Sequence, residues 1–511
     1  MISCFSSSDT LPFQLITLAT ILLVVTLFIL IKQKKLSKTA AAALNLPPGP
    51  KKLPIIGNIH QMPGDLPHRR LRDLAGKHGP DVMSLQLGEL SYIVISTPEA
   101  AKLVMKTHDV AFASRPYLLV TDKLFYGRKG IGFAPYGDHW RHARRVQSFR
   151  RIREEAVANL VASLTAAAAG ETSVDLTRMA STVTSAITTR AAFGKAQELT
   201  DAANFMVVVD NISDLLGGFR ITDLYPSLTF LPALTGLKAK LEKMSKASDS
   251  VLDQIIDEHK SRRTRAATTK DDRHGSYKED LVDVLLNLQE KQVDLGAPPI
   301  TMEVVKAITL ELFLAGIETS ATTIEWTMSE MINNSRVLQM AQEEVRQVYG
   351  DDASLDQLNY LDMVIAESLR LHPPGPLLLP RENGNQKVEL SSYEVPINTK
   401  VIVNVWAINR DPRYWKEAER FLPERFMDYS IDYKGTDFQF IPFGAGRRMC
   451  PGVSFGMAIV KLTLANLLFH FDWVLPAGQK SIDMTECFGM TLRKQYALHL
   501  IPVSYNRVPF E

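Results

Sequence analysis

The chain has 511 residues, of which 46% are hydrophobic and 22% are charged, the composition of an ordinary globular protein. Its formal net charge of +2 is too close to neutral to indicate a nucleic-acid partner. The only cysteines are Cys4, Cys450 and Cys487. They exclude a disulfide framework and favour a reducing compartment, although one of them could serve as a ligand.

The N-terminal segment carries no charge from Leu11 to Ile31. This run is long enough to cross a hydrocarbon core of roughly 30 Å as a helix. Asp9 is the only charge before it, and four lysines follow it: Lys32, Lys34, Lys35 and Lys38. Since positive residues stay on the cytoplasmic side, the bulk of the chain is expected in the cytosol. A cleaved signal peptide is the alternative, but no basic residue precedes the run, which also exceeds a usual signal core.

We therefore expect residues 1–10 on the luminal side, 11–31 as a transmembrane anchor, 32–50 as a basic and proline-rich linker, and 51–511 as one domain. Between about Leu66 and Ser96, short apolar alternations predict strands, for example at 82–87 and 92–95. Beyond Pro98 helical periods dominate. Helices are expected at Glu154–Ala169, Leu176–Ala192, Lys238–Lys260, Asp280–Lys291, Thr301–Ile332, Gln357–Leu371 and Pro451–Phe471.

The charged stretch Lys260–Glu279 is expected to be a solvated loop rather than a binding segment. Strands return at Val388–Glu394 and Val401–Val405. No repeat of 20 to 50 residues is present, so a solenoid is not expected. The predicted fold class is mainly α with small β-sheets in a single domain.

The decapeptide Phe443–Gly452 carries most of the chemical information. Its glycines allow φ > 0 and a close approach of the backbone. Cys450 precedes Pro451, which suits the first position of a helix, and a cysteine at a helix N-terminus is favoured as the thiolate. A buried structural cysteine is the alternative, but the glycines and arginine at this spacing have no packing reason to occur together.

At these residues the sequence resembles the cytochrome P-450 family, whose cysteine signature is Phe-x-x-Gly-x-Arg-x-Cys-x-Gly. The fixed positions are Phe443, Gly446, Arg448, Cys450 and Gly452, and the resemblance runs from near Pro47 to about Pro502. It implies the fold of that family, haem b as cofactor, Cys450 as the axial ligand of its iron, and Arg448 as a partner of a haem propionate. The other fixed positions are expected in the same cofactor-binding loop.

A second motif, Ala315-Gly316-Ile317-Glu318-Thr319, lies in the middle of the long predicted helix. Ala315 and Thr319 share a face, and Gly316 would leave room on the helix for a flat cofactor and dioxygen. Taken alone, Thr319 would more simply hydrogen-bond to its own helix. The resemblance implies instead that Ala315 borders the cofactor and that Glu318 and Thr319 relay protons to oxygen.

Two further motifs fit the same family. Glu367 and Arg370 would be a weak surface pair in isolation, but the resemblance implies that they join Arg425 in a buried structural cluster. Trp140, Arg144 and Arg381 are expected to contact the haem propionates. The surrounding basic residues either help to dock an acidic electron donor or form a solvated helix face; they are Arg141, Arg144, Arg145, Arg150, Arg151 and Arg153.

The chain departs from the family after Trp140, where roughly ten residues, or about three helical turns, are missing relative to related plant enzymes. The resemblance implies a membrane-bound monooxygenase of the plant endoplasmic reticulum that takes electrons from an NADPH–cytochrome P-450 reductase and oxidises a small apolar substrate. A terpenoid is the first expectation, followed by an indole alkaloid or a phenylpropanoid. The alternatives are an O2-independent haem isomerase or dehydratase of the same fold and a degenerate copy that no longer holds haem.

Overall fold

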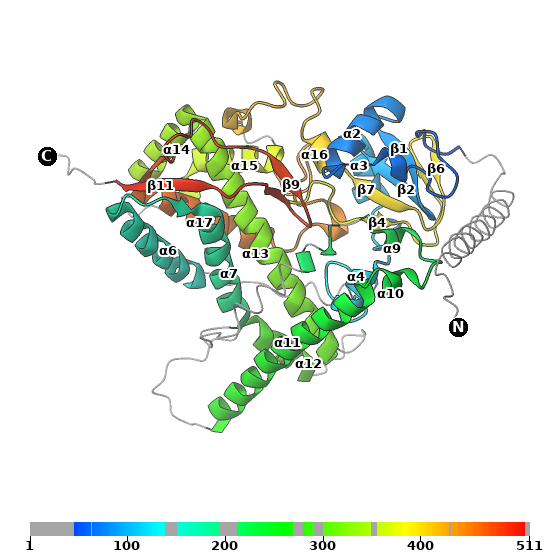
Figure 1. The fold of residues 1–511 in the computed structure, drawn as a ribbon, viewed down its shortest axis with the longest axis horizontal. Coiled ribbons are helices and arrows are strands. Elements are labelled where there is room, and N and C mark those ends of the chain that lie inside the picture. Colours follow the sequence, from blue (N-terminus) through cyan, green and yellow to red (C-terminus); the bar gives the residue numbers. More distant parts are fainter. Residues whose placement is uncertain are drawn as a thin grey trace, which may run out of the picture.

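The computed structural model describes residues 45–505 except 63, 138–139, 141–150, 194–211, 214, 218, 269–279, 291–299, 349–354 and 429–430. Over these residues the protein is mainly helical with small sheets, which confirms the predicted fold class (Figure 1). The expected luminal segment and anchor, and the linker as far as residue 44, lie outside the described residues.

The largest sheet lies at the N-terminal side of the fold, drawn in blue and yellow in Figure 1. Its strand order is β1 (Val82–Leu87), β2 (Leu90–Ile95), β7 (Lys400–Val403) and β4 (Arg381–Glu382). β2 and β7 are parallel, and the other two pairs are antiparallel. The two predicted strands in the first half of the chain are thus confirmed, and β4 brings Arg381 to the sheet edge.

The stretch that precedes this sheet is a helix, α2 (Pro67–His78), and the strand predicted from Leu66 onward is wrong there. Pro67 occupies the first turn, where a proline costs no hydrogen bond. Leu71, Leu74 and Ala75 are buried at helical spacing and form one apolar face. The period of this face, rather than the short apolar alternations around it, decides the local structure.

Three smaller sheets complete the β-structure. One has the order β3 (Val174–Asp175), β11 (His499–Ser504) and β8 (Phe471–Val474). The others are the hairpins β5–β6 (Val388–Leu390 and Tyr393–Val395) and β9–β10 (Glu486–Phe488 and Leu492–Lys494). The predicted strand at 388–394 is therefore a hairpin, which turns at Ser391 with φ of 58°.

The long predicted helices are confirmed to within a few residues, except for the end of α11. They are α6 (Arg151–Ala169), α7 (Leu176–Phe193), α11 (Leu237–Thr268), α12 (Leu281–Glu290), α13 (Met302–Asn333), α15 (Asn359–Leu371) and α17 (Val453–His470). The sequence reading did not identify α14 (Ser335–Val348) or the short helices α3 (Pro98–Lys102), α4 (Leu119–Leu124), α9 (Ile221–Leu224), α10 (Leu231–Leu234) and α16 (Val405–Ile408). α13 crosses the middle of the molecule and packs against α7, α15 and α17 (Figure 1).

Part of the charged stretch predicted as a loop is helical, because α11 continues to Thr268. Arg263 donates hydrogen bonds to Glu290 and Asn287 of α12, and Arg262 lies 3.3 Å from Asp280. The charges therefore pair across two helices instead of facing only solvent.

A buried polar cluster of His259, Asp280 and Asp283 lies at the start of α12. The side chain of Asp280 accepts from the backbone N–H of Asp283 at 3.0 Å, and that of Asp283 accepts from the backbone N–H of Asp280 at 3.2 Å. This is a reciprocal helix cap. His259 contacts Asp280 at 2.9 Å, so the cluster ties α11 to the capped end of α12.

Within the described part of the chain, α17 is the one helix long and apolar enough to suit a membrane span. It is nevertheless a helix of the core, in which Ile459, Leu464 and Leu468 are fully buried. Its apolar composition is explained by packing against α13, α14 and α6.

Candidate active site

The cysteine loop is a tight turn that leads into α17. The backbone N–H of Cys450 donates to the carbonyl of Phe443 at 2.9 Å and closes the loop. Gly446 has φ of 69°, and a Cβ added there would lie 2.0 Å from the carbonyl oxygen of Met105. Only glycine fits at this position, as the sequence reading expected.

Two details of the loop differ from the prediction. α17 begins at Val453 with Gly452 as its N-cap, so Pro451 precedes the helix instead of opening it. Gly452 has φ of −92°, which any residue can adopt, and a Cβ there would lie 3.8 Å from the sulfur of Cys450. An alanine at position 452 would therefore meet the sulfur at an ordinary contact distance, and the backbone conformation there requires no glycine.

The thiol of Cys450 is exposed, and so is Ala315 in the middle of the otherwise buried helix α13. α17 crosses α13 close to both, because a Cβ on Gly456 would lie 3.5 Å from the hydroxyl of Ser320. The cysteine loop and the centre of α13 thus meet at one crossing. An exposed Cys450 and an exposed small residue at the centre of a core form an internal face that the described residues leave open.

The proton-relay candidates lie on α13 at this crossing. The hydroxyl of Thr319 donates to the carbonyl of Ala315 at 2.6 Å, which is the local hydrogen bond expected from Thr319 alone. Glu318 accepts a hydrogen bond of 2.5 Å from the hydroxyl of Thr491, and its Oε1 lies 3.5 Å from Nε of Arg493. Oε2 of Glu318 is buried and makes no hydrogen bond within the described residues.

The prediction that Gly316 leaves room for a flat cofactor and dioxygen is wrong. A Cβ at Gly316 would lie 3.3 Å from the side chain of Thr188 on α7. The glycine therefore allows a close crossing of α7 and α13, and the face that it opens is occupied by another helix. Ala315, its neighbour, is the residue that borders the internal face.

Three buried guanidinium groups gather beside the cysteine loop. Arg448 donates to the carbonyls of Ala113 at 2.6 Å and Ala134 at 2.5 Å, and its guanidinium lies 4.5 Å from the ring centroid of Trp140. Arg381 donates to the carbonyl of Ala445 at 3.0 Å. The third group belongs to Arg115, which sequence reasoning missed. Arg115 donates to the carbonyls of Gly132, Leu379 and Pro380.

This cluster carries more positive charge than the nearby carboxylates neutralise. Burial, together with repulsion from Arg381 and Arg448, holds the pKa of Arg115 well below its usual range. Burial also lowers the pKa of Arg381 to about 10, although its Nη1 lies 3.5 Å from Asp109. Buried cations without enough carboxylate partners need an anionic ligand, and the two propionates of haem match that requirement.

The indole nitrogen of Trp140 donates to the carbonyl of Ile131 at 2.9 Å. Trp140 thus lies beside Arg448, and its contact with a propionate stays a prediction. Arg144, and with it the segment expected to be shortened, lies outside the described residues. Arg115 could have been found as a lone charge in the apolar run 110–120.

The expected structural cluster is present, with Glu367 and Arg370 fully buried and Arg425 partly buried. Oε1 and Oε2 of Glu367 accept hydrogen bonds from Arg370 at 2.9 and 2.7 Å, and Oε1 also accepts from Arg425 at 3.0 Å. The backbone N–H of Leu422 donates to the same carboxylate at 2.8 Å. These bonds join α15 to the segment at 422–425, behind the cysteine loop.

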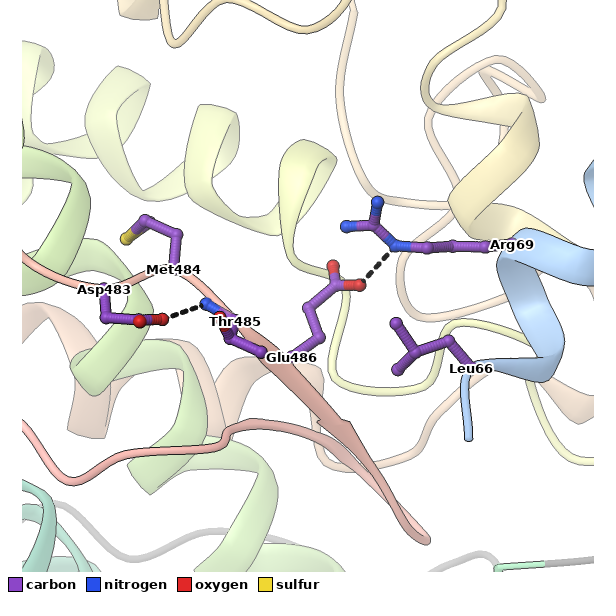
Figure 2. Close-up of a pocket in the computed structure, with 6 residues that line it drawn as sticks. All are labelled: Leu66, Arg69, Asp483, Met484, Thr485 and Glu486. Carbon is purple, nitrogen blue, oxygen red and sulfur yellow. Dashed lines mark hydrogen bonds and ion pairs between the residues drawn. The ribbon is translucent and has the colours of Figure 1, made fainter. Parts of the chain in front are cut away.

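A surface pocket between α2 and β9 lies apart from the internal face (Figure 2). Arg69 and Glu486 form an ion pair at 2.7 Å across it, and His68 contacts the same carboxylate at 3.1 Å. Burial acts to raise the pKa of Glu486, but the hydrogen bonds from His68 and Arg69 prevail and lower it to about 2. The pocket is lined by groups that already pair with one another, which indicates a structural role.

Comparison with known proteins agrees with this geometry. The model of the cytochrome P450 family matches residues 47–500. Desmethyl-deoxy-podophyllotoxin synthase of Sinopodophyllum hexandrum is 46% identical to the chain, with 95% of this chain and 96% of that protein covered. Premnaspirodiene oxygenase of Hyoscyamus muticus is 43% identical, with 96% of this chain and 99% of that protein covered.

A zebra fish cytochrome P450 solved with abiraterone has a similar structure, with a TM-score of 0.72 and 26% sequence identity. The match covers 87% of this chain and 100% of that one. Enzymes of this family use haem and O2 and take electrons from a reductase. Because the family model spans nearly the whole described domain, the chain belongs to the cytochrome P450 family and is a monooxygenase of that family.

Proposed function

We propose that this enzyme oxidises an apolar plant secondary metabolite, with a terpenoid as the first candidate. The observation that supports the proposal best is the internal face at the crossing of α13 and α17, where an exposed thiol meets an exposed alanine beside a buried cluster of cations. Bound haem would supply the iron centre at which O2 is reduced and one oxygen atom is transferred to the substrate.

In this proposal Cys450 binds the iron as a thiolate, and Phe443, Gly446 and Gly452 shape the loop that presents it. Ala315 would leave space for the cofactor beside α13. The propionates would be bound by Arg115, Arg381 and Arg448, with Trp140 and Arg144 in support.

Glu318 and Thr319 would deliver protons on the oxygen side. Thr491 and Arg493 orient the carboxylate of Glu318 through its Oε1. Thr319 would pass a proton on through its hydroxyl. The acid–threonine pair favours an oxygen-activating enzyme over an O2-independent isomerase.

The substrate would lie between 377–379, 489–491 and the segment near 118–133. These segments are largely apolar, as expected for a pocket that binds by buried area. Two relatives with nearly equal identity to this chain are named after compounds of different kinds, podophyllotoxin and premnaspirodiene. The preference for a terpenoid therefore depends on resemblance to the oxygenase.

The electron donor would be an NADPH–cytochrome P450 reductase of the endoplasmic reticulum membrane, to which residues 11–31 would anchor the enzyme. Three large apolar side chains in and around α9 and α10 support attachment, since Ile221, Phe230 and Leu234 are 55%, 57% and 75% exposed. Tyr225 joins this region to Ile55, close to the start of the described chain. Such a patch next to a predicted anchor suits an apolar lipid surface.

The proposal is tested with microsomes that contain the enzyme and a plant reductase, supplied with NADPH and a panel of sesquiterpenes, diterpenes and phenylpropanoids. We expect oxygenated product from at least one terpene, and a lower yield of product per NADPH consumed in Thr319→Ala. Thr323→Ala is the matched control, because Thr323 makes the same kind of hydrogen bond one turn later, to the carbonyl of Thr319 at 2.8 Å. Turnover of phenylpropanoids alone would overturn the substrate class, and an unchanged yield in Thr319→Ala would overturn the relay.

A further inference from the structure

The carboxylate of Glu311 is buried in a loop of the chain on the internal side of α13. Glu311 lies one helical turn before Ala315 and is 8% exposed. Its Oε2 accepts hydrogen bonds from the backbone N–H groups of Ile131 and of Gly132, the latter at 2.9 Å. A Cβ added to Gly130 would lie 2.2 Å from Cδ of Glu311, so the loop encloses the carboxylate only because glycine stands there.

The carbonyl groups of the same loop bind the cationic side of the candidate haem site. Residues 130–134 thus donate hydrogen bonds from backbone N–H groups to Glu311 of α13, and their backbone carbonyls accept hydrogen bonds from the buried arginines. The carbonyl bonds are Arg115 to Gly132 at 2.9 Å, Trp140 to Ile131 at 2.9 Å, Arg448 to Ile131 at 3.2 Å and Arg448 to Ala134 at 2.5 Å.

We propose that Glu311 is a positioning residue that fixes residues 130–134 against α13 and thereby sets the shape of the substrate pocket and the placement of Arg115 and Arg448. The proposal rests on the proposed haem site. Glu311 would act through the loop, because the loop encloses both of its carboxylate oxygens. Oε1 is buried and makes no hydrogen bond within the described residues, so neither oxygen is presented to a substrate.

The buried environment of Glu311 is energetically unfavourable for a charged carboxylate. Burial raises the pKa of Glu311 to about 7, and the N–H groups of 131–133 with Arg115 only partly oppose this effect. Within the described residues, Arg115 is the charged side chain that faces it most closely. An apolar residue would avoid this cost but would leave buried N–H groups of the loop without acceptors.

Hydrogen exchange of the haem-loaded, full-length enzyme tests the positioning role. In Glu311→Met, amide exchange in a peptide covering 130–134 should rise by about tenfold or more, because its N–H groups lose their acceptor. Glu311→Gln keeps one acceptor oxygen, so its exchange should lie between those of the wild type and the Met variant. Glu303→Gln is the matched control, since Glu303 on the same helix pairs with Lys129 at the exposed end of the same segment, and it should leave exchange at 130–134 unchanged.

A second measurement asks whether the loop shapes the pocket. Imidazole would occupy only the position at the iron, whereas the phenyl ring of 4-phenylimidazole would extend into the space near α13, and the binding of both can be followed through the haem absorbance. We expect Glu311→Met to change the Kd of 4-phenylimidazole several-fold and to leave that of imidazole unchanged.

Three outcomes overturn the positioning role: unchanged exchange at 130–134 in Glu311→Met, an equal change in both Kd values, or no change in either. If the wild-type protein binds neither azole and shows no haem spectrum, the proposed haem site fails instead. The exchange measurement, made on that haem-free full-length protein, still decides whether Glu311 holds the loop.

Discussion

The hydroxyl of Thr491 donates a hydrogen bond of 2.5 Å to Oε1 of Glu318, and so connects the β9–β10 hairpin to the centre of α13. The two residues are far apart in sequence, and the bond places a segment expected over the substrate beside a residue expected to relay protons. The carboxylate of Glu318 is therefore oriented by the C-terminal part of the fold as well as by its own helix.

Replacement of Thr491 by valine removes this bond without a large change in volume. A hydrogen bond to a charged group contributes about 1.5–3 kcal/mol, so Glu318 should lose its fixed orientation. We expect more hydrogen peroxide and less product per NADPH consumed, with an unchanged haem content. An unaltered ratio of product to NADPH in Thr491→Val would show that Thr491 does not orient the relay.

The buried cluster around Glu367 should be essential for stability. Glu367→Gln leaves Arg370 and Arg425 with an uncompensated buried charge, which costs about 3–5 kcal/mol. We expect a clearly lower urea midpoint or loss of folded protein. Glu417→Gln removes an exposed pair with Arg420 and should change stability by less than about 0.5 kcal/mol. Equal effects of the two substitutions would contradict the structural role.

Gly446 and Gly452 of the cysteine loop should respond differently to alanine. Gly446→Ala combines a positive φ with a clash against the carbonyl of Met105, so the variant should fail to retain haem. Gly452→Ala meets neither obstacle and should fold with haem bound. The ratio of haem absorbance to protein absorbance measures both variants, and a Gly446→Ala enzyme with full haem content would show that the loop is less constrained than its geometry indicates.

Acid should destabilise the enzyme partly through Glu486. Its folded-state pKa of about 2 is below the ordinary value of 4.5, so its contribution is complete above pH 4.5 and is lost as pH falls toward 2. The shift corresponds to about 3 kcal/mol. Urea unfolding between pH 6 and 3 should therefore show a shallower decline in Glu486→Gln than in the wild type. Parallel declines would mean that the ion pair with Arg69 does not carry this pH dependence.

Much of the fold could be predicted because periodic apolar faces decide several of the helices, as at α12 and α15. Two of the errors occurred where distant partners decide the local structure. α11 extends into a charged stretch because Arg263 pairs with α12, and Gly316 serves the crossing with Thr188 of α7. Such partners lie in other elements and leave no local pattern.

The signature residues of the candidate site were identified because their types and spacing match a known family. Arg115 and Glu311 were missed, since their roles depend on hydrogen bonds to the backbone of 130–134 and 379–380. Each is a single charge within an apolar run, and that is the signal by which they could have been found.

The ligation of haem iron by Cys450 is tested most directly by the spectrum of the reduced, carbon monoxide-bound protein. Microsomes with the wild-type enzyme should give the absorbance typical of a thiolate ligand, and Cys450→Ser should lose it. Cys487→Ser is the control, because Cys487 lies on β9, away from the cysteine loop, and it should leave the spectrum unchanged. A thiolate-type spectrum of normal strength in Cys450→Ser would contradict the assignment.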